Sequence, residues 1–448
     1  MAKEGSLQAP VRHPIAWRDP DFHDEAKLDA EMRRVFEICH GCRRCFNLCD
    51  SFPRLFDLID ASPDEVAGVK SDDFAQVVEA CTLCDMCFLT KCPYVPPHEF
   101  NLDFPHLMLR HRAAQAARGK SDFAARQLAQ MDRNGRLAKF ASPVVNWAGR
   151  RGNAVTRPLM EKTAGIHRDA NLPSFAARTF MAEEKRAPVS PNPTAPAFGK
   201  RKCAIYATCF VNYNKPSTGL AARAVLNHLG VETVAAYPGC CGMPFLEQAE
   251  LARVATNAAK IAGELMKLVN EGFDIVTLTA SCGLMLKFEW PLILPENEDV
   301  QALSQVAYDI DEYVIDIARN EGLPAGMQAL PEGVSVHIAC HERAQVMGQK
   351  SAEMLKLIPD TPVTVIERCS GHGGTFGVMK ATQPSAVKIG RPVFRAAANA
   401  ARGHIVSSCP LAAQHIAENV KDMAAKDGLR AAEPEHPIEI MAKAYGLK

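Results

Sequence analysis

The sequence predicts an α+β protein in which a helical, cysteine-rich N-terminal domain precedes a duplicated α/β domain with parallel sheets. Three observations predict this architecture. Half of the sixteen cysteines lie between Cys39 and Cys92, short β-branched runs alternate with helical stretches after residue 200, and this alternation occurs twice. The 448 residues leave room for about three domains.

The composition is that of an ordinary globular protein, with 47% apolar and 23% charged residues. Lys and Arg total 51 and are balanced by 51 Asp and Glu, which argues against a nucleic-acid partner. No uncharged apolar stretch approaches the roughly 18 residues of a membrane-spanning helix, and residues 1–24 contain no hydrophobic signal-peptide core. We therefore expect a cytoplasmic protein.

Two runs of cysteines in the N-terminal domain have the spacing of iron–sulfur ligands. Each run has three cysteines at two-residue gaps and a fourth further along. In such runs three thiolates of one loop bind one cubane, and the fourth binds the other cubane. The spacing predicts two [4Fe–4S] clusters, one held by Cys39, Cys42, Cys45 and Cys92 and the other by Cys81, Cys84, Cys87 and Cys49.

Other interpretations of these runs are less specific. A zinc ribbon needs only paired CxxC motifs, not two full triplets. The usual pattern has Pro where Asp50 stands and a shorter gap before Cys92, but neither departure removes a ligand.

We interpret His40 as a surface hydrogen-bonding residue rather than a ligand. Helices over 25–38 and 72–80 would pack around the clusters, and such clusters carry single electrons.

The C-terminal half alternates strands with helices in two sets. We expect strands over 204–208, 231–237, 274–279, 334–339, 363–367 and 405–407, and helices over 218–229, 247–269, 342–357 and 385–401. Each strand runs into a cysteine, and equivalent cysteines of the two sets are 131, 129 and 127 residues apart (Cys209 to Cys340, Cys240 to Cys369, Cys282 to Cys409). Parallel sheets bind ligands beyond the carboxyl ends of their strands, so each set of thiols should converge on one site.

The two predicted sites differ in their thiols. The first has enough ligands for a further iron–sulfur cluster or for zinc: Cys209, Cys240, Cys241 and Cys282. The second has Cys340, Cys369 and Cys409, with Ser370 in place of a fourth cysteine. Two interpretations stay open here: Ser370, His341 or His372 completes an open site, or the copy has decayed and binds no metal. We expect Cys203 to be a core residue and residues 371–377 to bring backbone N–H groups close to sulfur.

The expected domains are residues 1–103 with the two clusters, 104–200 as a basic helical segment with a Pro-rich linker over 187–202, 201–325 as the first repeat and 326–448 as the second. Between residues 106 and 165, twelve Lys and Arg face three acids, and apolar residues are interleaved with them. This segment has either a face for an anionic membrane or a solvated helical face packed on its own domains. We favour the second interpretation, because the apolar positions are also needed for a core.

Several strings resemble the CCG-domain proteins, a group that includes the C subunit of anaerobic glycerol-3-phosphate dehydrogenase and the B subunit of heterodisulfide reductase. They are Cys209-Phe-Val-Asn-Tyr-Asn-Lys-Pro216, Cys240-Cys-Gly-Met-Pro244, Cys340-His341, Gly373-Gly-Thr-Phe-Gly377 and His436-Pro437. The resemblance implies a duplicated CCG-type domain and a non-flavin iron–sulfur subunit of an oxidoreductase. Such a subunit passes electrons from a flavoprotein dehydrogenase toward the quinone pool, peripherally on the cytoplasmic face of the inner membrane. Two departures from the family pattern, Ser370 and Ala412, fall in the second site.

Two other functions fit the same motifs. In both, the chain is a stand-alone iron–sulfur oxidoreductase. It is either a thiol or disulfide reductase that acts at the second site, or an electron donor to a peroxide-reducing, rubrerythrin-type partner. No GxGxxG fingerprint follows a predicted strand, so a redox partner has to supply flavin or nicotinamide chemistry.

Overall fold

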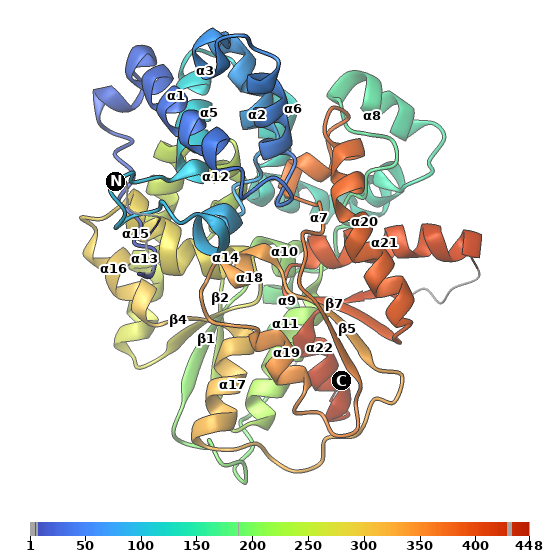
Figure 1. The fold of residues 1–448 in the computed structure, drawn as a ribbon. Coiled ribbons are helices and arrows are strands. Elements are labelled where there is room, and N and C mark those ends of the chain that lie inside the picture. Colours follow the sequence, from blue (N-terminus) through green and yellow to red (C-terminus); the bar gives the residue numbers. More distant parts are fainter. Residues whose placement is uncertain (1–4, 6–7, 187, 428–431, 448) are drawn as a thin grey trace.

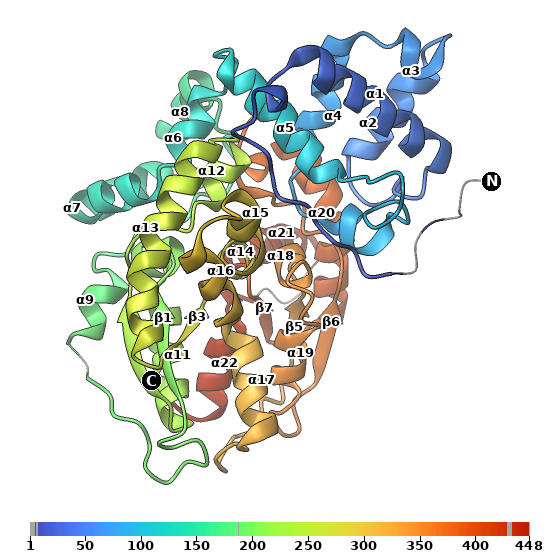
Figure 2. The same ribbon diagram turned by 90° about the vertical axis from the view of Figure 1, so that its left-hand side faces the viewer.

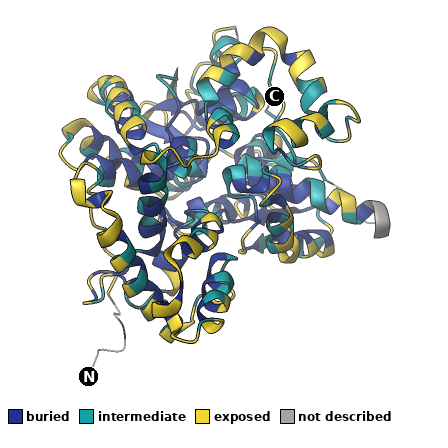
Figure 3. Ribbon diagram, turned by 90° about the horizontal axis from the view of Figure 1, so that it is seen from above, coloured by how far each residue is buried: buried dark blue, intermediate teal, exposed yellow. Residues whose placement is uncertain are grey.

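The computed structural model describes residues 5, 8–186, 188–427 and 432–447. It confirms the α+β class: a helical N-terminal block lies over two four-stranded parallel sheets (Figure 1). Seen from above, buried residues concentrate in the interior elements and exposed residues line the outer sides of the peripheral helices (Figure 3). In the described residues, no helix combines the length and apolar character needed to cross a membrane.

The N-terminal block is built from short helices around an aromatic core. Asp24 caps the first helix by accepting a hydrogen bond from the Lys27 backbone, and the helix ends where Arg43 adopts a left-handed conformation. This helix therefore extends beyond the predicted 25–38 and carries Cys39 and Cys42 on its last turn. The elements are η1 (Pro20–Phe22), α1 (Glu25–Cys42), α2 (Ser51–Asp60), α3 (Glu65–Gly68), η2 (Ser71–Phe74), α4 (Ala75–Glu79), η3 (Cys87–Lys91) and α5 (Phe104–Ala117).

The basic segment contains separate helices rather than one continuous helical stretch. After α5 they are α6 (Phe123–Leu128), α7 (Met131–Gly149), α8 (Thr156–Ala164) and α9 (Phe180–Glu184). Helix α7 kinks at Ala141, two residues before Pro143, and projects from the body of the molecule (Figure 2). The described linker residues 188–201 form no helix or strand.

The two sheets have the same strand order, which confirms the duplication. The first has the order β2-β1-β3-β4 and the second β6-β5-β7-β8, and all their pairings are parallel. The strands are β1 (Lys202–Tyr206), β2 (Glu232–Ala236), β3 (Asp274–Thr277), β4 (Ala307–Asp309), β5 (Val334–His337), β6 (Val363–Ile366), β7 (His404–Ser407) and β8 (Pro434–Glu435). The sequence did not predict β4 and β8, because runs of three and two residues show no periodicity.

Helices cover both sheets. In the first repeat they are α10 (Cys209–Tyr213), α11 (Pro216–His228), α12 (Met243–Glu247), α13 (Leu251–Asn270), α14 (Ala280–Leu284), η4 (Met285–Glu289), α15 (Trp290–Ile293), α16 (Glu298–Gln305) and α17 (Ile310–Asn320). In the second they are α18 (Cys340–Arg343), α19 (Lys350–Leu355), η5 (Gly374–Gly377), α20 (Gln383–Ala400), α21 (Pro410–Asp427) and α22 (Pro437–Ala444). The single helix predicted over 342–357 is wrong: it breaks into α18 and α19, because Val346 and Gly348 adopt left-handed conformations.

One hydrophobic core joins the two repeats. Fully buried side chains from both sheets belong to it, including Ile205 of β1 and Val336 of β5. The last helix, α22, packs against α11 of the first repeat, although it belongs to the second repeat in the sequence. Burial of apolar surface stabilises a fold by roughly 25 cal/mol per Å², so this shared core helps to hold the two repeats together.

A buried cluster of charges attaches the N-terminal block to the first repeat. Arg12 lies 2.6 Å from Asp85, 2.8 Å from Asp103 and 3.2 Å from Glu289. His106 contacts the same Asp103 and Glu289 carboxylates at 3.1 and 3.4 Å. Because Asp85 lies between Cys84 and Cys87, these ion pairs fix the second cysteine loop against η4.

Candidate metal centres

The first thiol group lies at the end of α1. Cys39, Cys42, Cys45 and Cys92 line one pocket, which Phe52 and Phe56 close on the core side. Burial raises the pKa of Cys39, and the neighbouring Cys92, Cys45 and Cys42 thiols raise it further. The backbone N–H groups of Tyr94 and Val95 donate to the Cys92 sulfur and lower its pKa against the effect of burial. The structure thus brings Cys92 to the triplet of the opposite run.

The second group brings Cys49 to Cys81, Cys84 and Cys87. Burial raises the pKa of Cys49, and Cys84 and Cys81 raise it further, while N–H groups of Ser51 and Phe52 at the start of α2 donate to its sulfur. Burial also raises the pKa of Cys87, with contributions from Cys84, Cys81, Cys49 and, across the group boundary, Cys45. The two thiol groups are therefore adjacent.

The residues fit the predicted iron–sulfur clusters. Each group contains four thiols drawn from both runs, and N–H groups donate to sulfur in both, an arrangement that stabilises thiolates. Among the described residues, no three His, Cys, Asp or Glu side chains surround one point closely enough for a single metal ion. His40 hydrogen-bonds through Nε2 to Asp60 at 2.9 Å, as expected for a residue with a surface role.

The first C-terminal site lies at the carboxyl ends of β1, β2 and β3. Its thiols form two close pairs, with 3.7 Å between the sulfurs of Cys209 and Cys240 and 3.1 Å between those of Cys241 and Cys282. All four residues are buried. The adjacent Cys240 and Cys241 can both face the site because Gly242 adopts a left-handed φ of 91° directly after them.

Polar groups from three elements surround this first site. Asp132 of α7 accepts a hydrogen bond from the Cys240 backbone N–H at 3.0 Å and another from the Tyr237 hydroxyl. The Trp290 indole donates to the Cys241 carbonyl at 2.9 Å, and the Tyr206 hydroxyl donates to Gly239 at 2.6 Å. No sequence pattern pointed to Asp132, which was only one of three acids in the basic segment.

Interactions among the thiols of the first site give them different pKa values. The interactions with the Cys209 and Cys241 thiols lower the pKa of Cys240 well below its usual range. The hydrogen bond to Cys240 and burial both raise the pKa of Cys209. The site can therefore stabilise thiolate at Cys240, the state required of a metal ligand.

The second C-terminal site brings together Cys340, Cys369 and Cys409 beyond β5, β6 and β7. Burial raises the pKa of Cys340, and the neighbouring Cys84, Cys369 and Cys409 thiols raise it further. Of the sixteen cysteines, all of which the structure describes, Cys369 is the only exposed one. The Gly371 N–H donates to the Cys369 sulfur at 3.3 Å, in agreement with the role expected of the glycine-rich string.

The three candidates for the fourth position of this site lie in different surroundings. His341 accepts or donates at Nδ1 with the Ser281 hydroxyl at 2.9 Å, and its buried Nε2 has no partner among the described residues. The Nε2 of His372 is likewise unpartnered there, and its ring centroid lies 6.0 Å from that of His415. Ser370 is buried beside the exposed Cys369.

Glycines allow the second repeat to approach the N-terminal block closely. A Cβ on Gly373 would lie 2.5 Å from the Thr82 side chain, and one on Gly371 would lie 2.0 Å from the Ala386 carbonyl oxygen. Both residues have positive φ angles, 53° and 79°. The string 371–377 therefore holds the second site directly against the cysteine loop that contains Thr82.

The four thiol groups follow one another through the molecule. Cys45 of the first group neighbours Cys87 of the second, as described above. Burial raises the pKa of Cys84 to about 12, with the nearby Cys369 of the second C-terminal site contributing. Burial raises the pKa of Cys409 to about 11, and Cys282 of the first C-terminal site contributes. Cys203 lies outside this succession, fully buried on β1.

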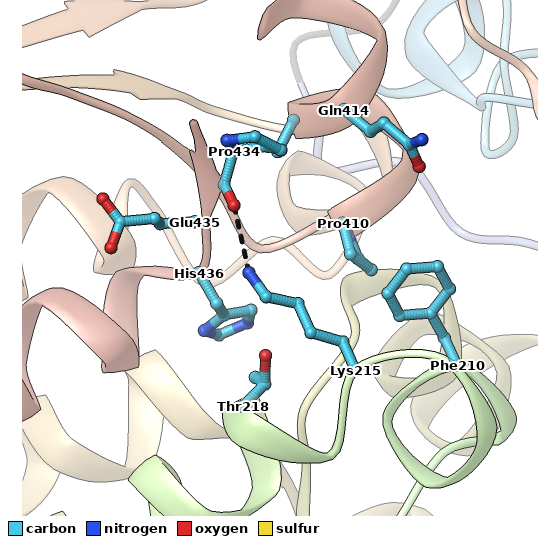
Figure 4. A pocket seen from close by; sticks show the side chains of 9 residues that line it. Phe210, Lys215, Thr218, Pro410, Gln414, Pro434, Glu435 and His436 are labelled. Atoms are coloured by element: carbon cyan, nitrogen blue, oxygen red, sulfur yellow. Dashed lines mark hydrogen bonds between the residues drawn. The ribbon is translucent and has the colours of Figure 1, made fainter. Parts of the chain in front are cut away.

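A small cavity of about 90 Å³ lies between the repeats, next to the residues that follow Cys209 and Cys409 (Figure 4). Phe210 and Pro410 form one side of it, and His436 lies opposite. The Lys215 ammonium donates to the Pro434 carbonyl at 3.0 Å and to Glu439 at 2.7 Å. The cation of this cavity is thus already paired, and its contacts tie α11 to β8 and α22.

Comparison with known proteins relates this chain to a cysteine-rich domain and to two groups of bacterial proteins. Residues 203–287, in the first repeat, match the model of the CCG cysteine-rich domain. The first repeat is thus similar to this cysteine-rich domain. It is 25% identical over 320 residues to the C subunit of anaerobic glycerol-3-phosphate dehydrogenase from Escherichia coli (strain K12), covering 71% of this chain and 76% of that protein. It is also 28% identical over 188 residues to lactate utilization protein A of Bacillus pumilus (strain SAFR-032), covering 40% of this chain and 75% of the relative.

Proposed function

We propose that this chain is the iron–sulfur electron-transfer subunit of an oxidoreductase, passing electrons from a flavoprotein dehydrogenase toward the quinone pool. We place it peripherally on the cytoplasmic face of the inner membrane. The observation that carries the proposal is the succession of neighbouring thiol groups, from Cys45 and Cys87 through Cys84 and Cys369 to Cys409 and Cys282. The similarity to a subunit of anaerobic glycerol-3-phosphate dehydrogenase supports it.

The proposal assigns a ligand role to the thiols. Cys39, Cys42, Cys45 and Cys92 would hold one [4Fe–4S] cluster, and Cys81, Cys84, Cys87 and Cys49 the other. Bound clusters of this kind are one-electron carriers. The first C-terminal site would hold a further iron–sulfur cluster or zinc on Cys209, Cys240, Cys241 and Cys282. The protein's part is to bury these thiols, to aim N–H groups at their sulfurs and to keep neighbouring groups in contact.

A partner experiment tests this function. The chain is purified anaerobically with its native neighbours, and we expect a flavoprotein to co-purify and to reduce it when the flavoprotein's substrate is added. Bleaching of the iron–sulfur absorbance would report that reduction, and a soluble quinone analogue should reverse it. A chain that a co-purified flavoprotein cannot reduce, or that reduces no quinone, contradicts the proposal.

One observation favours a second candidate, a thiol or disulfide reductase. Cys369 is the exposed residue of a site with three thiols, and a substrate sulfur would approach from that side. Replacing Cys369 by Ser should then abolish disulfide reduction while the spectroscopic signals of the N-terminal clusters stay intact. If C369S leaves electron transfer to quinone intact and no disulfide is reduced by the unmodified chain, the electron-transfer proposal stands.

A further inference from the structure

The outer side of α7 exposes an apolar stripe. Leu137 and Phe140 before the kink at Ala141, and Val144 and Trp147 after it, form two pairs at helical spacing, and their exposed fractions are 65%, 85%, 64% and 57%. Exposed large apolar residues are concentrated here: eight of the fifteen in the described chain lie within residues 123–159, the other four being Phe123, Val145, Val155 and Leu159. The expectation that the apolar residues of this segment serve a core holds for Leu107 and Leu109 and is wrong for six of the eight, all but Val155 and Leu159, for which no core role was expected.

Cations flank the stripe. Arg133, Arg136 and Lys139 on α7 and Arg150 directly after it are exposed. In the part of the chain that the structure describes, none of the four forms an ion pair, while Arg133 and Arg136 bond to amide and carbonyl oxygens. We call these four residues and the stripe the α7 outer face: Arg133, Arg136, Leu137, Lys139, Phe140, Val144, Trp147 and Arg150.

The inner side of the same helix covers the first C-terminal site. Gly135 packs against the ring of Tyr213, where a Cβ would lie 2.4 Å from ring carbons. Met131 packs against the buried cluster of Cys209, Tyr213 and Cys240. Asp132 accepts the hydrogen bond from the Cys240 backbone. One helix therefore has the last thiol group of the succession on one side and an unpartnered apolar, basic surface on the other.

We propose that the α7 outer face binds an anionic lipid bilayer, with its apolar stripe in the headgroup region and its four cations on lipid phosphates. The inference deepens the proposed function, because it names the surface through which the protein meets the membrane. It places the first C-terminal site directly behind the membrane-bound helix. Interfacial helices of this kind combine Trp, Phe and Leu on one side with Lys and Arg beside them.

The form and charge of the surface favour a bilayer over a protein partner. The helix projects from the body of the molecule (Figure 2). Its exposed charges are all of one sign, as anionic headgroups require. The apolar residues are exposed side chains of this projecting helix, which a deformable lipid layer can cover without a shaped counterpart.

Vesicle sedimentation tests the inference. The full chain, purified anaerobically with its iron, is mixed with phosphatidylglycerol–phosphatidylcholine vesicles or with pure phosphatidylcholine vesicles. We expect it to sediment with the anionic vesicles only. F140S/W147S should weaken binding by about tenfold or more, because each aromatic ring loses its burial in the interface. R136Q/K139Q should weaken it by roughly thirtyfold, at about 1 kcal/mol per cation, and added salt should do the same.

Matched variants elsewhere on the surface separate this effect from a general loss of apolar area or charge. V189S/F198S removes two apolar side chains that are 47% and 45% exposed outside α7. K260Q/K356Q removes two exposed cations elsewhere, one on α13 and one directly after α19. Both controls should bind vesicles like the unmodified chain, and the iron content of all variants should be equal.

Three results would overturn the inference. In the first, the unmodified chain stays in the supernatant with anionic vesicles. In the second, the α7 variants sediment like their controls. In the third, F140S/W147S keeps its vesicle binding but no longer captures a purified flavoprotein. Failure of the proposed function is seen separately: a chain that binds vesicles but contains no iron refutes the electron-transfer role and leaves the lipid surface standing.

Discussion

The two C-terminal sites lie on sheets of the same strand order and differ in the loops that follow the strands. Both lie beyond three parallel strands in sheets of the same order. The first has four buried thiols, whereas the second has three and exposes Cys369. The duplicated fold therefore fixes where thiols converge, while the residues of the connecting loops decide whether a site is closed or open.

The two repeats also contact the N-terminal block by different means. The contact with the first repeat includes a buried cluster of charges, formed by Arg12, His106 and Glu289, beside an apolar core that the two parts share. The second is held by close packing of glycine on Thr82. Charge pairs respond to pH and close packing does not, so the two attachments can be separated by experiment.

The largest expected effect comes from removing a thiol of the closed site. Replacing Cys241 by Ala should eliminate the metal of the first C-terminal site, because the three remaining buried thiols cannot complete its ligand set. Iron and zinc quantification after anaerobic purification measures this loss. C203A should leave the metal content unchanged, since Cys203 lies outside the thiol groups. Equal metal in C241A and C203A would contradict the assignment.

Adding a thiol to the second C-terminal site should raise the metal content of the chain. S370C restores a second cysteine beside Cys369 and should raise the metal content of the chain above that of the unmodified protein. S370A, the size-matched control, should not. If S370C gains no metal, residue 370 does not face the other ligands. Ser370 is then not the reason why the second site differs from the first.

The charged attachment should depend on pH. Burial and the Arg12 charge lower the pKa of His106, but the Asp103 and Glu289 carboxylates outweigh them and raise it to about 9. A pKa raised from 6.5 stabilises the fold fully below pH 6.5, and this stabilisation is lost as the pH rises through 9. H106Q should lower the free energy of unfolding by roughly 3 kcal/mol at about pH 6 and by little at about pH 10.

Substitution at the packed attachment provides the contrast. G373A places a Cβ against Thr82 at a left-handed φ, so it should destabilise the chain by about 1–3 kcal/mol at either pH. Urea unfolding of both variants at the same acidic and alkaline pH values measures the difference. A destabilisation by H106Q that is the same at both pH values would show that the ion cluster does not hold the first repeat.

The smallest effect is expected at Asp132, a positioning residue of the closed site. D132N keeps an oxygen acceptor for the Cys240 N–H but removes the charge. The free energy of unfolding should therefore fall by roughly 1 kcal/mol. The signature beyond stability is a shift in the reduction potential or optical spectrum of the metal bound there. The exposed D169N serves as the control. Identical spectra and stabilities for both variants would remove Asp132 from the site.

Much of this comparison was predictable from the sequence. The β-branched runs before each cysteine predicted six of the eight strands, and near-constant cysteine offsets predicted the duplication. The sequence could not indicate that α22 crosses to α11, because that contact depends on tertiary packing. Nor could periodicity distinguish an exposed Phe140 from a core residue, since both recur at helical spacing. Asp132 and Arg12 act across 108 and up to 277 residues, beyond any local motif.

The most direct test of the central claim is iron quantification with EPR spectroscopy of the reduced, anaerobically purified chain. Two [4Fe–4S] clusters require about eight irons per chain. Since Cys45 and Cys87 are neighbours, the two reduced clusters should also show magnetic interaction. About eight or more irons with interacting spins is the predicted result. Fewer than about eight irons, or two spin signals with no interaction, would contradict the account.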